Sequence, residues 1–202
     1  LEAIVGLRKP ERGRIYINGL DVTEKGVAYR RELGLAYIPD SRSEGLAYNM
    51  SIVENSVMNM LKQLFRKTPV IRWSKAEGVA RRVVEEYGVV YRSLGDPVSS
   101  LSGGNQQKLM AGREVSIGPR ILIAHEPTHG LDVSSANLVR SKLLELRDRG
   151  SAVLLASSDL DELLSLSDRI LVIFDGRIVG WGKPEDLSEE RLGLLMGGYV
   201  EA

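Results

Sequence analysis

Hydrophobic and polar positions follow two different periods along the first half of the chain. Alternation predicts a short strand at residues 14–18 (RIYIN), and a second short strand is predicted at 33–38 (LGLAYI), which stops at Pro39 and is followed by a polar loop at 40–45. Apolar residues at helical spacing then predict helices over 51–64 and 74–87. The chain therefore begins with a strand-rich part and continues into a helical part.

The second half alternates strands with helices. The predicted elements, in order, are strand 121–124 (ILIA), helix 133–149, strand 152–156 (AVLLA), helix 160–166, strand 170–174 (ILVIF) and strand 177–179. Asp175 and Gly176 form a strong turn pair between the last two strands, which predicts a hairpin. Alternating strands and helices are typical of a parallel sheet flanked by helices.

Composition excludes several classes of protein and of site. The chain has 202 residues, of which 43% are hydrophobic and 27% charged, as in an ordinary globular domain. Its 27 basic and 27 acidic residues cancel, which argues against a dedicated nucleic-acid-binding protein. No apolar run approaches the ~18 residues of a membrane span. The absence of Cys excludes disulfides and thiolate chemistry, and His125 and His129 are too few for a multi-histidine metal site.

The neutral total hides two charged regions. Residues 62–82 carry seven basic residues and one acidic residue, a local net charge of +6. Residues 159–202 carry four basic and ten acidic residues, a local net charge of −6. The favoured interpretation of each region is a solvated surface, and a phosphate-binding patch is the alternative for the first.

Residues 101–108 (LSGGNQQK) carry the sharpest chemical signal. Ser102 is followed by two glycines that open a predicted helix, and glycines let the main chain approach a ligand closely. The N–H groups of a first helical turn lack partners and the helix N-terminus is partly positive, so this pattern suits an anion. A plain Ser cap with a flexible Gly pair is the structural alternative.

The segment LSGGNQQK, followed by ILIAHEPTHGLD at residues 121–132, resembles the signature motif, Walker B strand, catalytic carboxylate and D-loop of ATP-binding cassette (ABC) ATPases. The wording YIPDSRSEGL is similar to the second cassette of tandem ATPases that power sugar and nucleoside importers, and EERLGLLMGG resembles the nucleoside branch. The resemblance implies an α/β, P-loop NTPase-like cassette. Its parallel-sheet core would comprise residues 1–48 and 119–202, and a helical subdomain would comprise 49–118.

The resemblance also places altered residues at the cassette's own nucleotide site. Glu126 occupies the position of the catalytic carboxylate, which polarises the attacking water, but it could also be a plain surface carboxylate. His125 replaces the Walker B Asp and is a poor Mg²⁺ ligand, so a partly buried structural histidine is favoured. Asp40 stands at the Q-loop Gln position and Ser158 at the switch His position. We therefore expect this site to be degenerate.

The Gly-rich Walker A loop (GxxxxGK[ST]) is not found in the sequence, and LEAIVGL at residues 1–7 resembles the end of the helix that follows it. The resemblance therefore implies that the chain starts just downstream of its own phosphate cradle, and we expect no turnover from it alone. An intact signature would instead cover ATP held by a partner cassette, through Ser102, Gly103, Gly104 and Gln106. Asp132 would couple the two sites, or cap the following helix, or both.

The implied cofactors are ATP and Mg²⁺. The implied partners are a second ABC cassette, in the same polypeptide or as a dimer, transmembrane permease subunits and, indirectly, an extracytoplasmic solute-binding protein. The resemblance places such a cassette peripherally on the cytoplasmic face of the membrane, with no nucleic acid expected. Two alternatives stay open: a non-transport ABC-class ATPase that acts on nucleic acid or the ribosome through residues 62–82, and a non-catalytic regulatory half.

Overall fold

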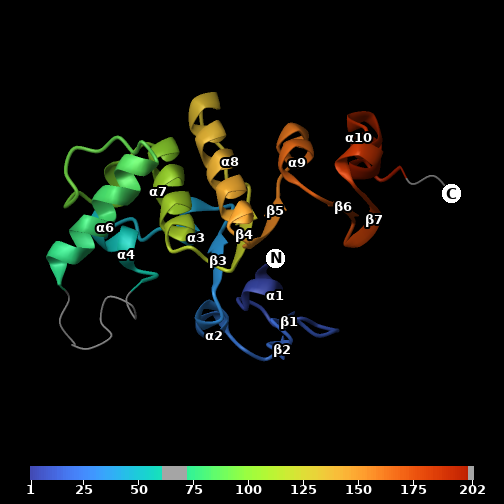
Figure 1. The fold of residues 1–202 in the computed structure, drawn as a ribbon, viewed down its shortest axis with the longest axis horizontal. Coiled ribbons are helices and arrows are strands. Elements are labelled where there is room, and N and C mark those ends of the chain that lie inside the picture. The colour runs from blue at the N-terminus through green and yellow to red at the C-terminus, as the bar shows by residue number, and fades with distance from the viewer. Residues whose placement is uncertain (61–71, 200–202) are drawn as a thin grey trace. The chain divides into compact units, whose positions relative to one another are not determined.

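A computed structural model describes residues 1–60 and 72–199 of the chain (Figure 1). The chain forms two compact units, Leu1–Leu154 and Leu155–Ala202. Within the described residues, no helix combines the length and the hydrophobicity needed to cross a bilayer. The boundaries expected for a helical subdomain, 49 and 118, stay a prediction.

The first unit begins with a small antiparallel hairpin. Strands β1 (Tyr16–Ile17) and β2 (Leu20–Asp21) are joined by Asn18 and Gly19, both with positive φ (51° and 77°). Two left-handed residues in a two-residue loop match the twist of the flanking strands. The strand predicted at 14–18 is therefore shorter than expected, because only its last part pairs.

A buried arginine fixes this hairpin to its neighbours. Arg30 lies on α2 (Val27–Glu32), a helix that the sequence pattern did not predict, and its side chain is 1% exposed. Its guanidinium donates hydrogen bonds to carbonyls of α1 (Glu2–Val5) and of the segment around β2. The acceptors are the carbonyls of Ala3 (2.5 Å), Ile4 (2.7 Å), Val22 (2.7 Å), Lys25 (2.9 Å) and Thr23 (3.3 Å).

A three-stranded sheet lies at the centre of the first unit. Its order is β3 (Leu35–Ile38), β4 (Ile121–His125) and β5 (Ala152–Ala156), the last of which spans the point where the two units divide. Strands β3 and β4 are parallel, with Leu35 opposite Ile121. All of β3 and the middle of β4 are buried, which confirms the expected parallel-sheet architecture.

Helix α7 (Gly103–Ser116) is central to the packing of the first unit. It contacts β3, α4 (Ile52–Val57) and α6 (Trp73–Glu86). A β-carbon at Gly112 would lie 2.8 Å from the ring of Tyr87, so only glycine allows α7 and α6 to approach this closely. The helix that begins at the signature glycines is therefore held firmly by the interior.

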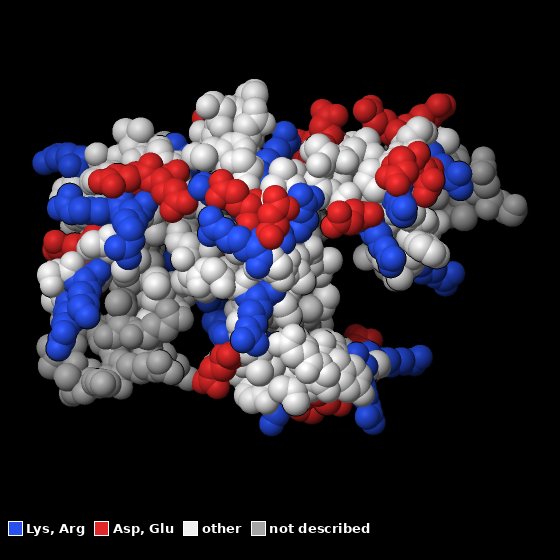
Figure 2. Space-filling model, in the orientation of Figure 1, with Lys and Arg blue, Asp and Glu red and all other residues white. Residues whose placement is uncertain are grey.

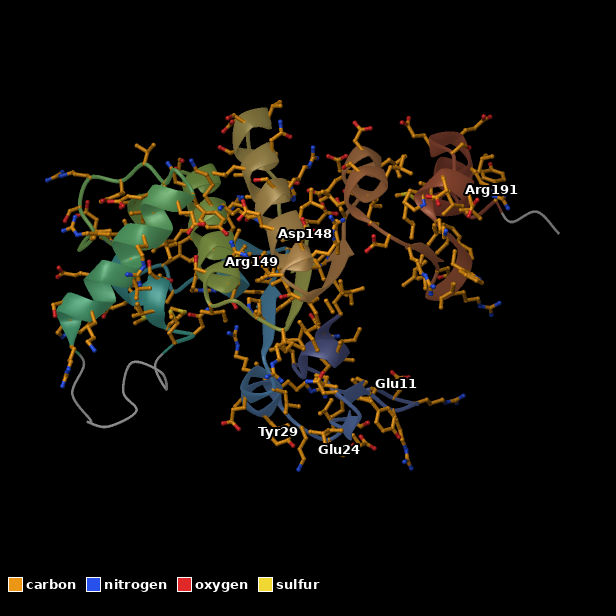
Figure 3. All side chains as sticks on the ribbon, viewed as in Figure 1. Glu11, Glu24, Tyr29, Asp148, Arg149 and Arg191 are labelled. Carbon is orange, nitrogen blue, oxygen red and sulfur yellow. The ribbon has the colours of Figure 1, made fainter. Side chains whose placement is uncertain are left out.

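In the first unit, helix α8 follows its prediction, and the segments at 51–64 and 40–45 differ from theirs. Helix α8 (Val133–Asp148) contacts α7, and it ends at Asp148, labelled in Figure 3 beside Arg149. The predicted helix at 51–64 is found only in part, because α4 ends at Val57 and residues 58–60 form a turn; the part from residue 61 onward lies outside the described residues. The loop predicted at 40–45 contains a helical turn, α3 (Arg42–Gly45).

The second unit is a hairpin covered by helices on one face. Strands β6 (Ile170–Phe174) and β7 (Arg177–Gly182) pair antiparallel, and helices α9 (Leu160–Leu166) and α10 (Glu189–Met196) flank them in sequence. The side chains of its core are Ile170, Val172, Leu187, Leu192 and Leu195. Acidic side chains gather over α9 and α10 in Figure 2, as the local net charge of this region indicates.

Candidate nucleotide site

The signature segment forms the N-terminus of α7. Ser102 precedes the helix in an extended conformation, and its hydroxyl accepts hydrogen bonds from the N–H (3.4 Å) and the side-chain amide (3.0 Å) of Asn105. Gly103 and Gly104 supply the first helical N–H groups, which have no carbonyl partner within a helix. Ser102 is exposed and both glycines are half-buried, so the N-terminal end of α7 is accessible.

Two buried glutamines hold this end of α7 in place. The Gln106 amide, 7% exposed, donates to the carbonyls of Val98 (3.3 Å) and Leu101 (3.0 Å), so this side chain faces the interior. Gln107, 1% exposed, donates to the carbonyls of Glu126 (3.3 Å) and Pro127 (3.0 Å). Gln107 thus ties the signature helix to the segment after β4, a role that its position in the motif alone does not reveal.

The end of β4 presents the carboxylate candidate. His125 and Glu126 are both half-buried. Glu126 has φ +48°, in the left-handed region that costs a residue with a side chain about 1–3 kcal/mol. Its carbonyl accepts from the N–H of His129 (3.1 Å) as well as from Gln107, which holds the tight turn. The turn fixes where the Glu126 side chain leaves the main chain.

Asp40 lies close to the D-loop. Its carboxylate oxygen is 3.7 Å from Nδ1 of His129, and both side chains are largely exposed. Asp132 ends this loop and caps α8, because its carboxylate accepts from the N–H (3.0 Å) and the hydroxyl (2.7 Å) of Ser135. The capping interpretation of Asp132 is therefore confirmed. Hydrogen bonds from the Ser135 side chain and main chain lower the pKa of Asp132 below its ordinary value.

Ser158 belongs to the second unit. It is exposed and lies two residues after the end of β5, just before Asp159, which caps α9 through the N–H of Glu162 (3.0 Å). Its role as a nucleotide sensor stays a prediction.

The basic region at 62–82 lies partly outside the described residues, and both signs of charge are mixed on the face of the first unit drawn in Figure 2.

The donor set at the end of β4 does not fit a magnesium ion held by this chain alone. Mg²⁺ prefers oxygen ligands in octahedral geometry, and the Walker B position offers the imidazole of His125. Across residues 1–60 and 72–199, no three His, Asp or Glu side chains gather as a metal site requires. No chemical step is therefore derived through a metal bound by these residues.

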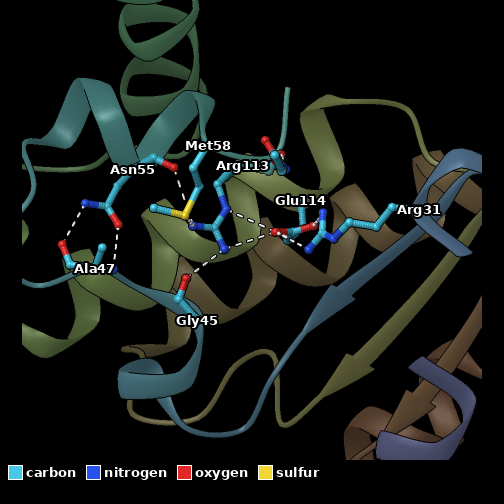
Figure 4. A network of polar contacts seen from close by, with 8 residues as sticks. Arg31, Gly45, Ala47, Asn55, Met58, Arg113 and Glu114 are labelled. Atoms are coloured by element: carbon cyan, nitrogen blue, oxygen red, sulfur yellow. Dashed lines mark hydrogen bonds and ion pairs between the residues drawn. The ribbon is translucent and has the colours of Figure 1, made fainter. Parts of the chain in front are cut away.

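An ion network anchors the other end of α7 (Figure 4). Glu114 is fully buried and accepts from both terminal nitrogens of Arg31 (3.2 and 3.3 Å) and from Nε of Arg113 (3.0 Å). Arg113 also donates to the carbonyls of Gly45 (2.8 Å) and Asn55 (3.4 Å). Burial lowers the pKa of Arg113, and the Glu114 charge opposes that shift. These side chains line an open hollow of about 1650 Å³ in the first unit.

The fold is that of known cassette structures. A dimeric ATP-binding cassette, solved in a post-hydrolysis state with ADP and Pi, matches with a TM-score of 0.78 at 19% identity, over 91% of this chain and 78% of that chain. An ATP-binding subunit of an ABC transporter matches with a TM-score of 0.71 at 23% identity, over 100% of this chain and 77% of that chain. The sheet, the signature helix and these likenesses define an α/β cassette of the P-loop NTPase class.

The sequence comparison gives the family. Residues 1–129 match the family model described as ABC transporter. The chain is 40% identical to the guanosine import ATP-binding protein NupO of Bacillus subtilis, over 100% of this chain and 40% of that protein. It is 39% identical to the nucleoside import ATP-binding protein NupA of Lactococcus lactis, over 98% of this chain and 40% of that protein. The chain belongs to the ABC transporter family and spans about two fifths of the length of these relatives.

Proposed function

We propose that this chain is a cassette of an importer ATPase that completes the nucleotide site of a partner cassette. The signature glycines, Gly103 and Gly104, bind the terminal phosphates of an ATP molecule held by the Walker A loop of that partner. Ser102 adds its hydroxyl, and Gln106 holds the loop from the interior. ATP binding and hydrolysis at this composite site then drive solute import.

One observation carries the proposal: the accessible N-terminus of α7 is firmly fixed and lies against the D-loop of the same chain. A β-carbon at Gly104 would lie 3.7 Å from the carbonyl oxygen of Gly130 and 3.8 Å from Cδ2 of Leu131. The anion-binding end of the helix and the loop before Asp132 thus form one surface. The terminal phosphate of the ATP held by the partner cassette would then contact both parts of that surface.

The chain's own site has lost donors that phosphate chemistry uses. His125 offers a nitrogen where Mg²⁺ needs a hard oxygen, and Asp40 adds a negative charge where the family has an amide. Ser158 offers one hydroxyl in place of an imidazole. We infer that this site hydrolyses little or no ATP, so each pair of cassettes has one working site, and Mg²⁺ enters with the partner's ATP.

The relatives suggest the place of the chain in a larger assembly. NupO and NupA are named for import of guanosine and of nucleosides, and a Haloferax volcanii relative with 35% identity is named for glucose import. We propose a nucleoside or sugar as the solute and the second position of a tandem ATPase for this chain. Permease subunits would be direct partners, a solute-binding protein an indirect one, and the cytoplasmic membrane face the location.

The test is a Gly104→Asp variant in the full gene product, assembled with its partner cassette and permease. The added carboxylate repels phosphate, so ATPase activity and transport should fall at least about 100-fold, as expected when several preorganised donors are lost. A β-carbon at Gly104 makes only ordinary contacts, so the melting temperature should change little. Gly78→Asp is the matched control, because Gly78 lies on α6 with no other residue near its β-carbon position.

The control should keep wild-type activity. If Gly104→Asp folds and retains ATPase activity comparable to that of Gly78→Asp, the composite-site proposal is wrong. Nucleotide hydrolysis by the purified 202-residue chain would contradict the part of the proposal that assigns the working Walker A loop to a partner.

A further inference from the structure

Arg42 lies against the two glycine segments that form the proposed phosphate surface. It is the first residue of α3 and follows the Q-loop position Asp40 by two residues. A β-carbon at Gly103 would lie 3.4 Å from both Cζ and Nη2 of Arg42, and one at Gly130 would lie 3.5 Å from Nη1. The guanidinium is therefore placed between the start of α7 and the D-loop, and both neighbours lack side chains that could cover it.

The Arg42 side chain differs from the other arginines buried in this unit. Arg30 donates to five carbonyls, and Arg31 and Arg113 both pair with Glu114. Within the part of the chain that the structure describes, the half-buried Arg42 guanidinium makes no hydrogen bond or ion pair. Its five donors are fixed in a planar fork that suits the oxygens of a phosphate or a carboxylate.

We propose that Arg42 is a further phosphate-binding residue of the composite site, where its guanidinium donates hydrogen bonds to the γ-phosphate of the ATP that the signature covers. The proposal rests on the function proposed above. Two main-chain N–H groups at a helix end carry only partial charge, and a guanidinium beside them adds a full positive charge at the same phosphate.

A role on the γ-phosphate predicts discrimination between ATP and ADP. The first measurement is the affinity of the assembled transporter ATPase for a non-hydrolysable ATP analogue and for ADP. Arg42→Gln should weaken binding of the analogue roughly 10- to 100-fold, the range for loss of a charged hydrogen bond, with little change for ADP. Arg42→Lys keeps the charge but loses the planar fork, so it should recover part of the affinity. Arg12→Gln, at an exposed arginine of the N-terminal loop, is the matched control and should match wild type.

The alternative is that Arg42 only packs over Gly103 and Gly130. In that case Arg42→Gln would weaken ATP analogue and ADP equally, or lower the melting temperature without changing their ratio, and Arg42→Lys would give no selective recovery. Either result overturns the assignment. If Gly104→Asp abolishes activity while Arg42→Gln leaves the ratio unchanged, only the Arg42 proposal fails. If Gly104→Asp has no effect, the proposed function fails first.

Discussion

Two neighbouring regions of the first unit are both held in place by caps and hydrogen bonds, but their side chains differ in chemistry. The signature region, residues 101–108, keeps its Ser cap, its glycine pair and two buried glutamines. The strand-end region, residues 125–132, keeps its carboxylate in a tight left-handed turn and its Asp cap on α8. At the position that the resemblance aligns with the Walker B Asp, however, it carries the imidazole of His125.

The difference teaches that the main-chain structure of a site and the ligating side chains that it carries can change independently. The two regions share a direct link, since Gln107 of the first bonds the carbonyls of Glu126 and Pro127 in the second. The Gln107 link reaches main-chain carbonyls of the strand-end region, so this link tolerates a change of side chain at residue 125. On the proposed function, the chain would lack hydrolysis at its own site and still present a fixed signature to a partner.

The largest expected effect on stability comes from the far end of the signature helix. Glu114→Ala leaves the buried Arg113 and the partly buried Arg31 without their shared carboxylate, and breaking a buried pair in this way costs about 3–5 kcal/mol. Urea unfolding should report that loss. The control is Glu24→Ala, whose exposed carboxylate pairs with the exposed Lys9, because a solvent-exposed ion pair contributes little to stability. Equal losses of unfolding free energy in the two variants would contradict the proposal that the buried Glu114 network stabilises this end of α7.

The link between the two regions can be cut selectively. Gln107→Ala leaves the carbonyls of Glu126 and Pro127 without their side-chain donor, at a cost of about 1–3 kcal/mol. Hydrogen exchange should then speed up across residues 126–131. Gln106→Ala is the matched variant, since its amide donates to Val98 and Leu101 and accepts from the hydroxyl of Tyr48, and none of these residues lies in the strand-end region. If both variants loosen the same peptides, Gln107 is not the specific link between the regions.

The sequence predicted most of the strands and helices, but it predicted few of the side-chain contacts that join them. Strand β5 and helix α9 match their predicted bounds, because their apolar pattern is local and their ends carry clear signals. Helix α2 escaped prediction, because only six residues form it and its buried Arg30 bonds carbonyls that are distant in the chain. The roles of Gln107 and Arg42 depend on which segments the fold brings beside them, so no local pattern could reveal them.

A smaller effect is expected at the Asp132 cap. Hydrogen bonds from Ser135 lower the pKa of Asp132, so its ionised cap stabilises the fold above the ordinary carboxyl pKa, and this contribution is lost as pH falls through the lowered pKa. Asp132→Ala should lower the melting temperature by roughly a few degrees at pH 7, and the difference should shrink toward pH 3. Asp132→Asn keeps a neutral cap and should stay close to wild type. A pH-independent difference for the Ala variant would exclude this explanation.

The smallest effect is expected where the two regions differ most in chemistry. A catalytic carboxylate contributes about 10²–10⁴-fold to hydrolysis. We expect Glu126→Gln to change the ATPase rate of the assembled transporter by less than about threefold, because in the proposed degenerate site the imidazole of His125 stands where hydrolysis needs a metal-binding oxygen. Gln keeps the size of the side chain, so the turn at φ +48° should persist and the melting temperature should report it. A loss of 100-fold or more in the folded variant would mean that Glu126 works at its own site, and the contrast between the two regions would then lie in their geometry alone.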